Sequence, residues 1–268
     1  MEIYIPTDPA SDPERRFNQL KNNTGECEMQ KTKINKFIQK YNLGGTVNSV
    51  KWNTNDKKLS TTFVTPDKSL LGNVSVDNVL FENMDIGIYQ TDQLQKLLNV
   101  LTDDVNFGIT KIGDRAISLK AKSDFTSVDY VLSDLSIIPD APSLKHVPEF
   151  GTSIEVDTKF IDTFIKGKNA LSDVDTFTVK KNSNGEVEII IGYSSTNTNR
   201  VNISVKTTKC DVETPISFNA NLFKEVLVAN RECTSAVLEV SNEGLARINF
   251  KVDDYNSTYY VVATQGVD

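Results

Sequence analysis

The sequence predicts an α+β protein with two similar domains, each made of two units in which one helix is followed by antiparallel strands. The first observation is a motif of three large apolar residues, Φ-x-x-Φ-Φ, which occurs four times in the 268 residues. This spacing puts the three side chains on one stripe of a helix. The copies begin 60, 67 and 62 residues apart, at Ile34, Leu94, Ile161 and Phe223. Near-even spacing of one element is typical of a repeat protein.

The second observation concerns the stretch after each copy of the motif. An alternating apolar and polar run, a polar turn and a second alternating run come next, and such alternation predicts paired strands. Each turn begins roughly twenty residues after its motif, as expected for one repeated unit. The turns are predicted at residues 53–56, 112–114, 182–185 and 242–244.

The first two units are assigned in order along the chain. The first helix is expected at 31–41, closed by Gly44 and Gly45, because glycine relieves the left-handed conformation at a helix end. Thr91 or Asp92 is the expected cap of the second helix, at 93–101. The predicted strands are 47–52, 59–64, one after the looser segment 65–72, 84–89, 106–111, 115–122 and 128–132.

The last two units have the same plan. Asp157 or Thr158 is expected to cap a helix that runs to about Lys168, and Asn219 one that runs to about Arg231. The pair Asn184-Gly185 predicts a type I′ hairpin turn. The predicted strands are 153–156, 177–181, 186–193, 200–207, 215–218, a hairpin after the fourth helix, and 258–263.

Proline marks the predicted boundaries. Residues 1–28 hold three of the eight prolines and no repeat, so they are interpreted as an N-terminal extension. Residues 138–150 hold Pro139, Pro142 and Pro148, and proline favours an extended chain, so this segment is predicted to be an interdomain connector. The predicted domains are therefore residues 29–137 and 151–268.

Composition and motifs argue against several kinds of function. Cys27, Cys210 and Cys233 form neither a disulfide framework nor a zinc pattern, and His146 is the only histidine. No glycine-rich phosphate loop is present. We therefore predict no catalytic residues, no metal site and no cofactor. The acidic pairs 103–104 and 253–254 are interpreted as solvated loop residues, with magnesium binding as the alternative.

The expected location is the cytoplasm, of a host cell if the protein is viral. The N-terminus begins without a basic segment or a long apolar run, so a secretory signal is not expected. No window approaches the roughly 18 apolar residues of a membrane span, so no membrane association is predicted.

The helix faces opposite the apolar stripes carry lysine, although the net charge is −7. At 100° per residue, the centre of that face falls at motif positions −2, +2 and +5. Lys36, Lys96, Lys159 and Lys166 occupy such positions, whereas Glu225 breaks the pattern in the fourth helix. A basic surface on an acidic protein is expected where the surface meets a polyanion, with salt-sensitive contacts to phosphates. The full predicted set is Lys33, Lys36, Lys40, Lys96, Lys159, Lys166, Lys168, Lys224 and Arg231.

This organisation resembles the sliding clamps of DNA replication, most closely the clamp of T4-like bacteriophages. The stretch 84–89 followed by 94–104 is similar to the second unit of that clamp, and the ending 259–263 to its last strand. The resemblance covers residues 29 to 268; the extension has no counterpart, and Glu225 departs from the basic inner face.

The resemblance implies the DNA-clamp fold, closing as a ring of twelve units from three chains. Helices line the hole, and the ring encircles duplex DNA without sequence preference. It tethers the replicative DNA polymerase for processive synthesis, without catalysis, and an ATP-driven clamp loader opens it. Partner peptides enter an apolar pocket between the connector and the last strand, where the matching candidates are Leu144, Val147, Tyr260 and Val262.

Two other functions remain open from the sequence. One is a β-rich virion or assembly protein whose repeats only build a scaffold; the lysines of the helix faces argue against it, because a scaffold does not need them on one face. The other is an enzyme whose site contains only Asp and Glu, which metal-dependent activity on nucleic acid would support.

Overall fold

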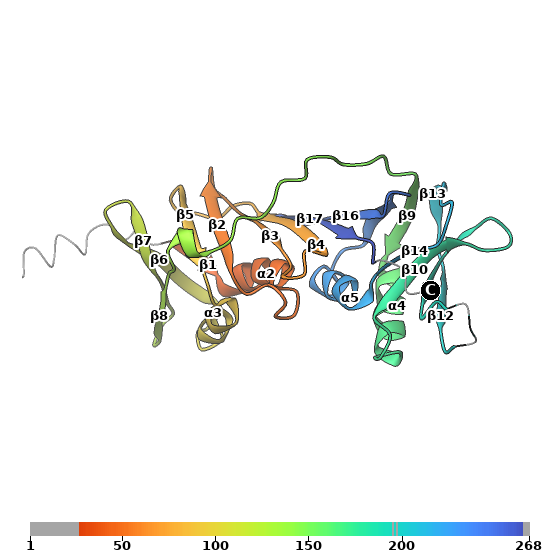
Figure 1. The fold of residues 1–268 in the computed structure, drawn as a ribbon. Helices are drawn as coiled ribbons and strands as arrows, with labels where there is room; N and C mark the ends of the chain where they lie inside the picture. The colour runs from red at the N-terminus through yellow and green to blue at the C-terminus, as the bar shows by residue number, and fades with distance from the viewer. Residues whose placement is uncertain (1–26, 195, 197, 265–268) are drawn as a thin grey trace, which may run out of the picture.

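The computed structural model of the chain describes residues 27–264 except 195 and 197 (Figure 1). Nearly all of the predicted extension lies outside the described residues. We refer to residues 27–137 as the N-half and to residues 151–264 as the C-half. Mixed helices and antiparallel strands make up both halves, which confirms the predicted α+β class.

The four predicted helices are confirmed, and each packs its apolar motif against the core, with only Leu97 and Ile165 of the motif residues partly exposed. Ile34, Phe37, Leu94, Phe164 and Phe223 are all at most 1% exposed, as the apolar stripe requires. The helices are α2 (Lys31–Asn42), α3 (Thr91–Leu98), α4 (Thr158–Ala170) and α5 (Ala220–Ala229).

The helix starts are capped in two different ways, by the residue before the helix or by a side chain from a distant part of the chain. The Asp157 carboxylate accepts the Phe160 N–H (2.7 Å) and the Asn219 amide oxygen accepts the Leu222 N–H (2.9 Å), as predicted. The predicted cap of α3 is wrong, because the helix begins at Thr91 after Gln90, and the Asn48 amide oxygen accepts the Asp92 N–H (2.9 Å). At α2, Asp103 accepts the Thr32 N–H (2.9 Å). That acidic residue is therefore a helix cap from a distant part of the chain.

The strands form three antiparallel sheets. The four-stranded sheet of the N-half has the order β1-β6-β7-β8, and that of the C-half has the order β12-β11-β10-β14. The third sheet has nine strands, in the order β13-β9-β15-β16-β17-β4-β3-β2-β5, and therefore contains strands of both halves. In the N-half the strands are β1 (Cys27–Gln30), β2 (Val50–Asn55), β3 (Lys58–Val64), β4 (Leu70–Val76), β5 (Met84–Ile88), β6 (Asp104–Ile112), β7 (Arg115–Lys122) and β8 (Ser127–Val131). In the C-half they are β9 (Thr152–Asp157), β10 (Thr176–Lys181), β11 (Val187–Ile191), β12 (Val201–Ser204), β13 (Thr207–Lys209), β14 (Ile216–Asn219), β15 (Ser235–Val240), β16 (Leu245–Val252) and β17 (Tyr255–Val262).

Two of the predicted hairpin turns differ from expectation. Asn184 does not have the positive φ that a type I′ turn needs at both central residues; only Gly185 does (φ 81°). Gly185 N–H donates to the Asn182 carbonyl (3.0 Å), so the loop is one residue longer and ends in a left-handed glycine. The two-residue loop with positive φ at both positions is instead Asp56-Lys57 (48° and 62°), beyond the predicted centre of the first turn.

The junction between the halves is an antiparallel ladder of β17 with β4. Tyr259 lies opposite Gly72 in this ladder, and the pairing runs from Tyr255 with Val76 to Val261 with Leu70. Alternate residues of β17 are buried, which fixes the register, since a shift by one residue would expose the whole set.

A buried lysine lies beside this ladder, where α2 meets α5. The Lys40 ammonium, with 0% of the residue exposed, donates to the Ala229 carbonyl (2.9 Å), to Asn230 Oδ1 (3.2 Å) and to Glu232 Oε1 (3.0 Å). The Tyr259 hydroxyl donates to the Lys40 carbonyl (2.8 Å). Burial lowers the pKa of Lys40, and attraction to Glu232 only partly offsets that effect. We name Lys40 with these four partners the Lys40 network.

We expect Lys40→Met to lower the free energy of unfolding by about 2–4 kcal/mol, because the change leaves Glu232, the Ala229 carbonyl and the buried Asn230 Oδ1 without their donor. Urea denaturation of the purified chain measures this. Lys36→Met is the matched control, since Lys36 lies one turn earlier on α2 and is only partly buried. Equal effects of the two substitutions would contradict the role given to the Lys40 network.

Candidate nucleic-acid interface and connector cavity

The four helices form one continuous row on the same side of the molecule (Figure 1). Helix α2 packs against α3 on one side and against α5 on the other, and α5 packs against α4. The row is a consequence of the β17–β4 ladder, because that ladder brings the helices of the two halves side by side. The connector lies on the opposite side of the molecule from the row (Figure 1).

Four of the predicted basic residues have side chains open to a ligand on this row. Lys96, Lys159 and Lys166 are exposed and Lys36 is partly exposed. Within the part of the chain that the structure describes, none of the four makes an ion pair. Their charges are therefore available to an anionic partner.

Three more predicted residues have acidic partners within the chain. Lys33 Nζ lies 2.8 Å from Asp254, and Arg231 lies 2.8 Å from Asp162. Lys224 lies 2.9 Å from its neighbour Glu225, the residue that departs from the basic pattern. Contact with a polyanion at these three sites requires breaking or sharing an ion pair.

The prediction is wrong for Lys40 and Lys168, because both side chains are buried. Lys168 Nζ donates to the carbonyls of Leu171 (3.2 Å) and Ser172 (3.0 Å), so it closes the end of its own helix. Its motif position is +7, which lies only about 20° from the apolar stripe at 100° per residue. The helical spacing alone therefore predicts burial for Lys168. Lys40 is buried because α5 covers its side of the helix.

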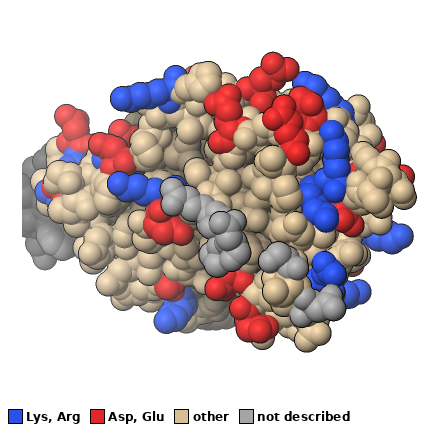
Figure 2. Space-filling model, turned by 45° about the vertical axis from the view of Figure 1, so that its right-hand side comes forward, with Lys and Arg blue, Asp and Glu red and all other residues tan. Residues whose placement is uncertain are grey.

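Charges of both signs share the molecular surface. Figure 2 shows acidic and basic side chains mixed over the face that it presents, with no large area of one sign. This agrees with the net charge of −7.

A cavity lies between the start of the connector and the N-half. Its volume is about 560 Å³, within the range of ligand sites. Ile137, Pro139 and Ala141 form the connector wall. The opposite wall consists of residues 46–50, 62–66, Lys68 and Tyr89. The wall residues are mostly apolar or uncharged, as expected of a site for apolar side chains.

The predicted partner residues lie elsewhere. None of Leu144, Val147, Tyr260 and Val262 lines this cavity. Leu144, Val147 and Val262 are between 39% and 47% exposed, so they remain accessible on the surface. The sequence prediction missed Ile137, which is 56% exposed and ends the short helix η3 (Leu135–Ile137) just before the predicted connector. The apolar pair Ile137-Ile138 directly before Pro139 was the available signal.

Tyr260 has a structural role beside the end of the connector. It lies opposite Arg247 in the β16–β17 ladder, and Arg247 lies opposite Glu239 in the β15–β16 ladder. Arg247 Nε donates to Glu239 Oε2 (2.7 Å), and its guanidinium lies 4.5 Å from the ring centre of Phe150. The hydrogen bonds to Glu239 and to Tyr260 raise the pKa of Arg247. A fixed guanidinium therefore holds the end of the connector against the sheet.

The start of the connector is also attached. Lys51 on β2 donates to Asp140 (2.5 Å). In addition, Ser133 N–H donates to the Gly87 carbonyl (2.9 Å) just before η3. The connector therefore crosses the sheet as a strap with both ends fixed.

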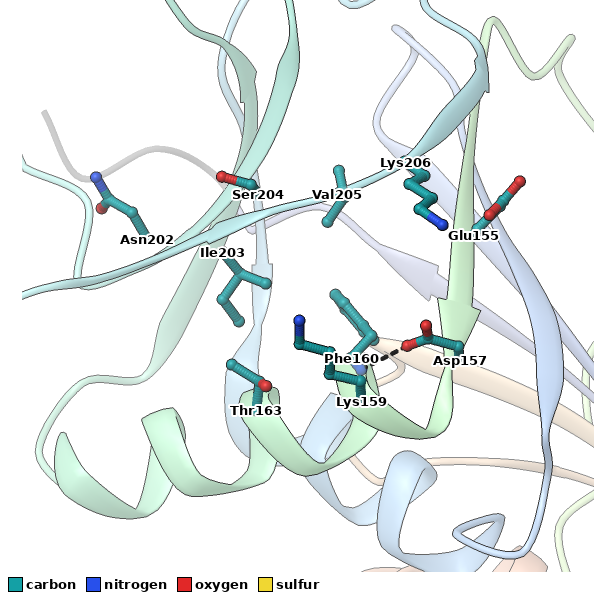
Figure 3. Close-up of a pocket in the computed structure, with 10 residues that line it drawn as sticks. All are labelled: Glu155, Asp157, Lys159, Phe160, Thr163, Asn202, Ile203, Ser204, Val205 and Lys206. Atoms are coloured by element: carbon teal, nitrogen blue, oxygen red, sulfur yellow. Dashed lines mark hydrogen bonds between the residues drawn. The ribbon is translucent and has the colours of Figure 1, made fainter.

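An edge strand lies toward each end of the elongated molecule (Figure 1). These are β8 at the end of the N-half and β12 at the end of the C-half. A cavity of about 330 Å³ lies beside β8 and is lined by Gln93, Leu97, Tyr130 and Val131, among others. A cavity of about 300 Å³ lies beside β12, between the chain at residues 202–206 and helix α4 (Figure 3).

No helix of the described residues is long and apolar enough to cross a membrane.

The comparison with known proteins gives matches to solved structures but none to protein-family models or curated proteins. No protein-family model matches the sequence, and no curated protein matches it. Solved structures match with TM-scores of 0.66–0.69. Proliferating cellular nuclear antigen (PCNA) from Entamoeba histolytica is 13% identical, with 90% of this chain and 98% of that chain covered and a TM-score of 0.68.

Two further structures are similar to the same extent. In a PCNA2–PCNA3 complex from Sulfolobus tokodaii the identity is 9%, with 89% and 98% coverage and a TM-score of 0.66. In A. fulgidus PCNA bound to the C-terminal region of FEN-1, the values are 13% identity, 91% and 99% coverage and a TM-score of 0.69. At such low identity the likeness establishes the fold alone. The chain has the fold of PCNA-type sliding clamps over about nine-tenths of its length.

Proposed function

We propose that the chain is the subunit of a non-catalytic sliding clamp that encircles duplex DNA and tethers the replicative DNA polymerase. The observation that carries the proposal is the continuous row of four helices on one side of sheets that have the PCNA fold. A row of this kind can line a hole. The scaffold alternative is not favoured, because the structural neighbours are PCNA proteins.

The edges β8 and β12 support closure of copies into a ring. Tyr130 of β8 lies 129 positions before Tyr259 of β17, and Asn73 of β4 lies 129 positions before Asn202 of β12. The repeat therefore makes β8 the counterpart of β17, and β12 the counterpart of β4. Since β17 pairs with β4 inside the chain, β8 of one copy is expected to pair with β12 of the next. Head-to-tail contacts of this kind generate rings.

The lysines on the helix row fit sequence-independent contact with phosphates. Lys36, Lys96, Lys159 and Lys166 supply charge that no ion pair uses within the described residues, and Lys33, Lys224 and Arg231 add to it where phosphates compete with acidic partners. Binding is expected to weaken steeply with salt, because each contact releases counterions from the DNA.

The connector cavity is the proposed site for partner peptides, among them a peptide of the polymerase. The connector is attached at both of its ends and is therefore in place before a partner arrives. This lowers the conformational entropy that is lost on binding. The FEN-1 region bound to A. fulgidus PCNA is one such partner of a structural neighbour. An ATP-driven clamp loader is the proposed opener of the ring, and the proposed location is the cytoplasm. The origin in a T4-like bacteriophage stays a prediction.

The first test is the mass in solution. We expect a homotrimer of about 90 kDa, three times the 29.8 kDa of the chain. Light scattering over micromolar concentrations measures it. A monomer at all concentrations would contradict the ring, whereas a trimer that dissociates on dilution would agree with it.

The second test concerns the row of helices. We expect the triple substitution of Lys36, Lys96 and Lys166 by Glu to impair loading and sliding on DNA, with a change in stability below about 0.5 kcal/mol for each site. Processive synthesis by the cognate polymerase at moderate salt is the readout. The control replaces Lys120, Lys122 and Lys251, which are exposed on strands, by Glu. Processivity equal to that of the parent would exclude the proposed DNA contact.

The third test concerns the connector cavity. We expect Ile137→Glu to weaken binding of a polymerase-tail peptide by at least about 2 kcal/mol, the typical cost at an apolar anchor site, while assembly is unchanged. Fluorescence anisotropy measures the affinity. Leu144→Ala and Val262→Glu test whether the site extends to the predicted residues outside the cavity. If only these two substitutions weaken binding, the site lies toward the last strand, as predicted from the sequence.

A further inference from the structure

The turn between β7 and β8 carries a phenylalanine that nothing within the described chain covers. Phe125 is 99% exposed, more than any other large apolar residue of the described chain. A single exposed apolar residue needs no explanation by itself. The position of this one within the repeat gives it a specific partner.

The counterpart of this turn inside the chain is Asp253-Asp254, between β16 and β17. The repeat offset of 129 residues aligns Phe125 with Asp254, as it aligns Tyr130 with Tyr259. Asp254 is seated on the first turn of α2, where its carboxylate lies 2.8 Å from Lys33 Nζ. Its carbonyl accepts the Asp77 N–H at the end of β4 (3.0 Å). The hairpin tip of one half therefore docks between a helix start and a strand end of the other half.

The C-half has the equivalent docking position beside its edge strand β12. The apolar motifs of α2 and α4 are 127 residues apart, which aligns Phe160 with Lys33. Phe160 lies in the first turn of α4 and lines the cavity beside β12 together with Ile203 and Val205. In Figure 3 the side chains of Phe160, Ile203 and Lys159 lie between helix α4 and the chain at residues 202–206.

Phenylalanine thus occupies both positions that are equivalent to one ion pair of the joint inside the chain. Lys33 and Asp254 form the pair at the in-chain joint, and their counterparts are Phe160 and Phe125. Replacing one partner alone would leave a charge against an apolar surface, whereas replacing both keeps the surfaces complementary. Phenylalanine at both positions is expected if Phe125 of one copy contacts Phe160 of another copy.

We propose that Phe125 of one copy inserts into the cavity beside β12 of the next copy, where it packs against Phe160 and Ile203. This inference rests on the proposed ring and identifies an apolar anchor of its closure. The cavity of about 300 Å³ has room for one aromatic side chain together with part of the turn. The carbonyl of Phe125 then takes the place of the Asp254 carbonyl and accepts the Lys206 N–H, the counterpart of Asp77 N–H.

A charge-swap cycle tests the contact. The mass of the parent, Phe125→Asp, Phe160→Lys and the double variant is measured by light scattering over a dilution series. Each single variant is expected to raise the concentration of half-assembly by at least about tenfold, as for an anchor residue at the centre of an interface. The double variant is expected to recover part of that loss, because it rebuilds the partly exposed ion pair found between Lys33 and Asp254. Ile112→Asp is the matched control, since Ile112 is 69% exposed at the tip of another hairpin and outside this joint.

The outcomes separate this inference from the proposed ring. A trimeric parent whose assembly Phe125→Asp leaves unchanged overturns the contact and leaves the ring standing. A parent that is monomeric at all concentrations overturns the ring and the contact with it.

Cross-linking gives an answer even if Phe160→Lys fails to fold. Phe125→Cys and Thr163→Cys are introduced together into a variant that already carries Cys27→Ser and Cys210→Ser. Thr163 is exposed and lines the cavity. Oxidation is expected to produce covalent multimers from the double variant and none from either single variant. Trimers that give no covalent product overturn the contact.

Discussion

The pairing of β17 with β4 is the constraint on which the rest of the structure depends. It makes one nine-stranded sheet out of strands from the two halves. The same pairing sets α2 beside α5, so that four helices form one row. The Lys40 network lies beside this ladder and joins the two helices through the Tyr259 hydroxyl. A buried ammonium is stable only with its acceptors in place, so the network fixes how the halves meet.

Much of the fold could be predicted from the sequence, because helix and strand periods differ. The motif beginning at Ile34 and its copies located the four helices, and alternation located most strands. The β17–β4 ladder could not be predicted this way. Alternation tells which side of a strand is buried but does not name its partner, and Tyr259 and Gly72 lie far apart in the chain. The turn at Asn184 shows the same limit on a local scale, since its dipeptide fits more than one hairpin loop.

The candidate site was predicted less completely. Spacing on a helix found Lys96 and Lys166, whose exposure depends only on their own helix. It was wrong for Lys40, whose burial depends on α5, and for Lys168, whose angle on the helix favours the core. Ile137 was missed because it lies before Pro139, just outside the predicted connector of residues 138–150. The boundaries of the two predicted domains stay a prediction.

The Lys40 network has no counterpart at the ends of the described chain. The repeat places Gly167 at the position of Lys40, and Leu101 at the position of Asn230. Asp103 stands at the position of Glu232, but its carboxylate is already engaged by Thr32. A joint between copies would therefore rely on strand edges and apolar contact, without a buried charge that must be desolvated or released. In the proposed ring, subunits would therefore separate at these joints, because opening them exposes strand edges and apolar side chains, whereas opening the joint within the chain would also remove the acceptors of the buried Lys40 ammonium.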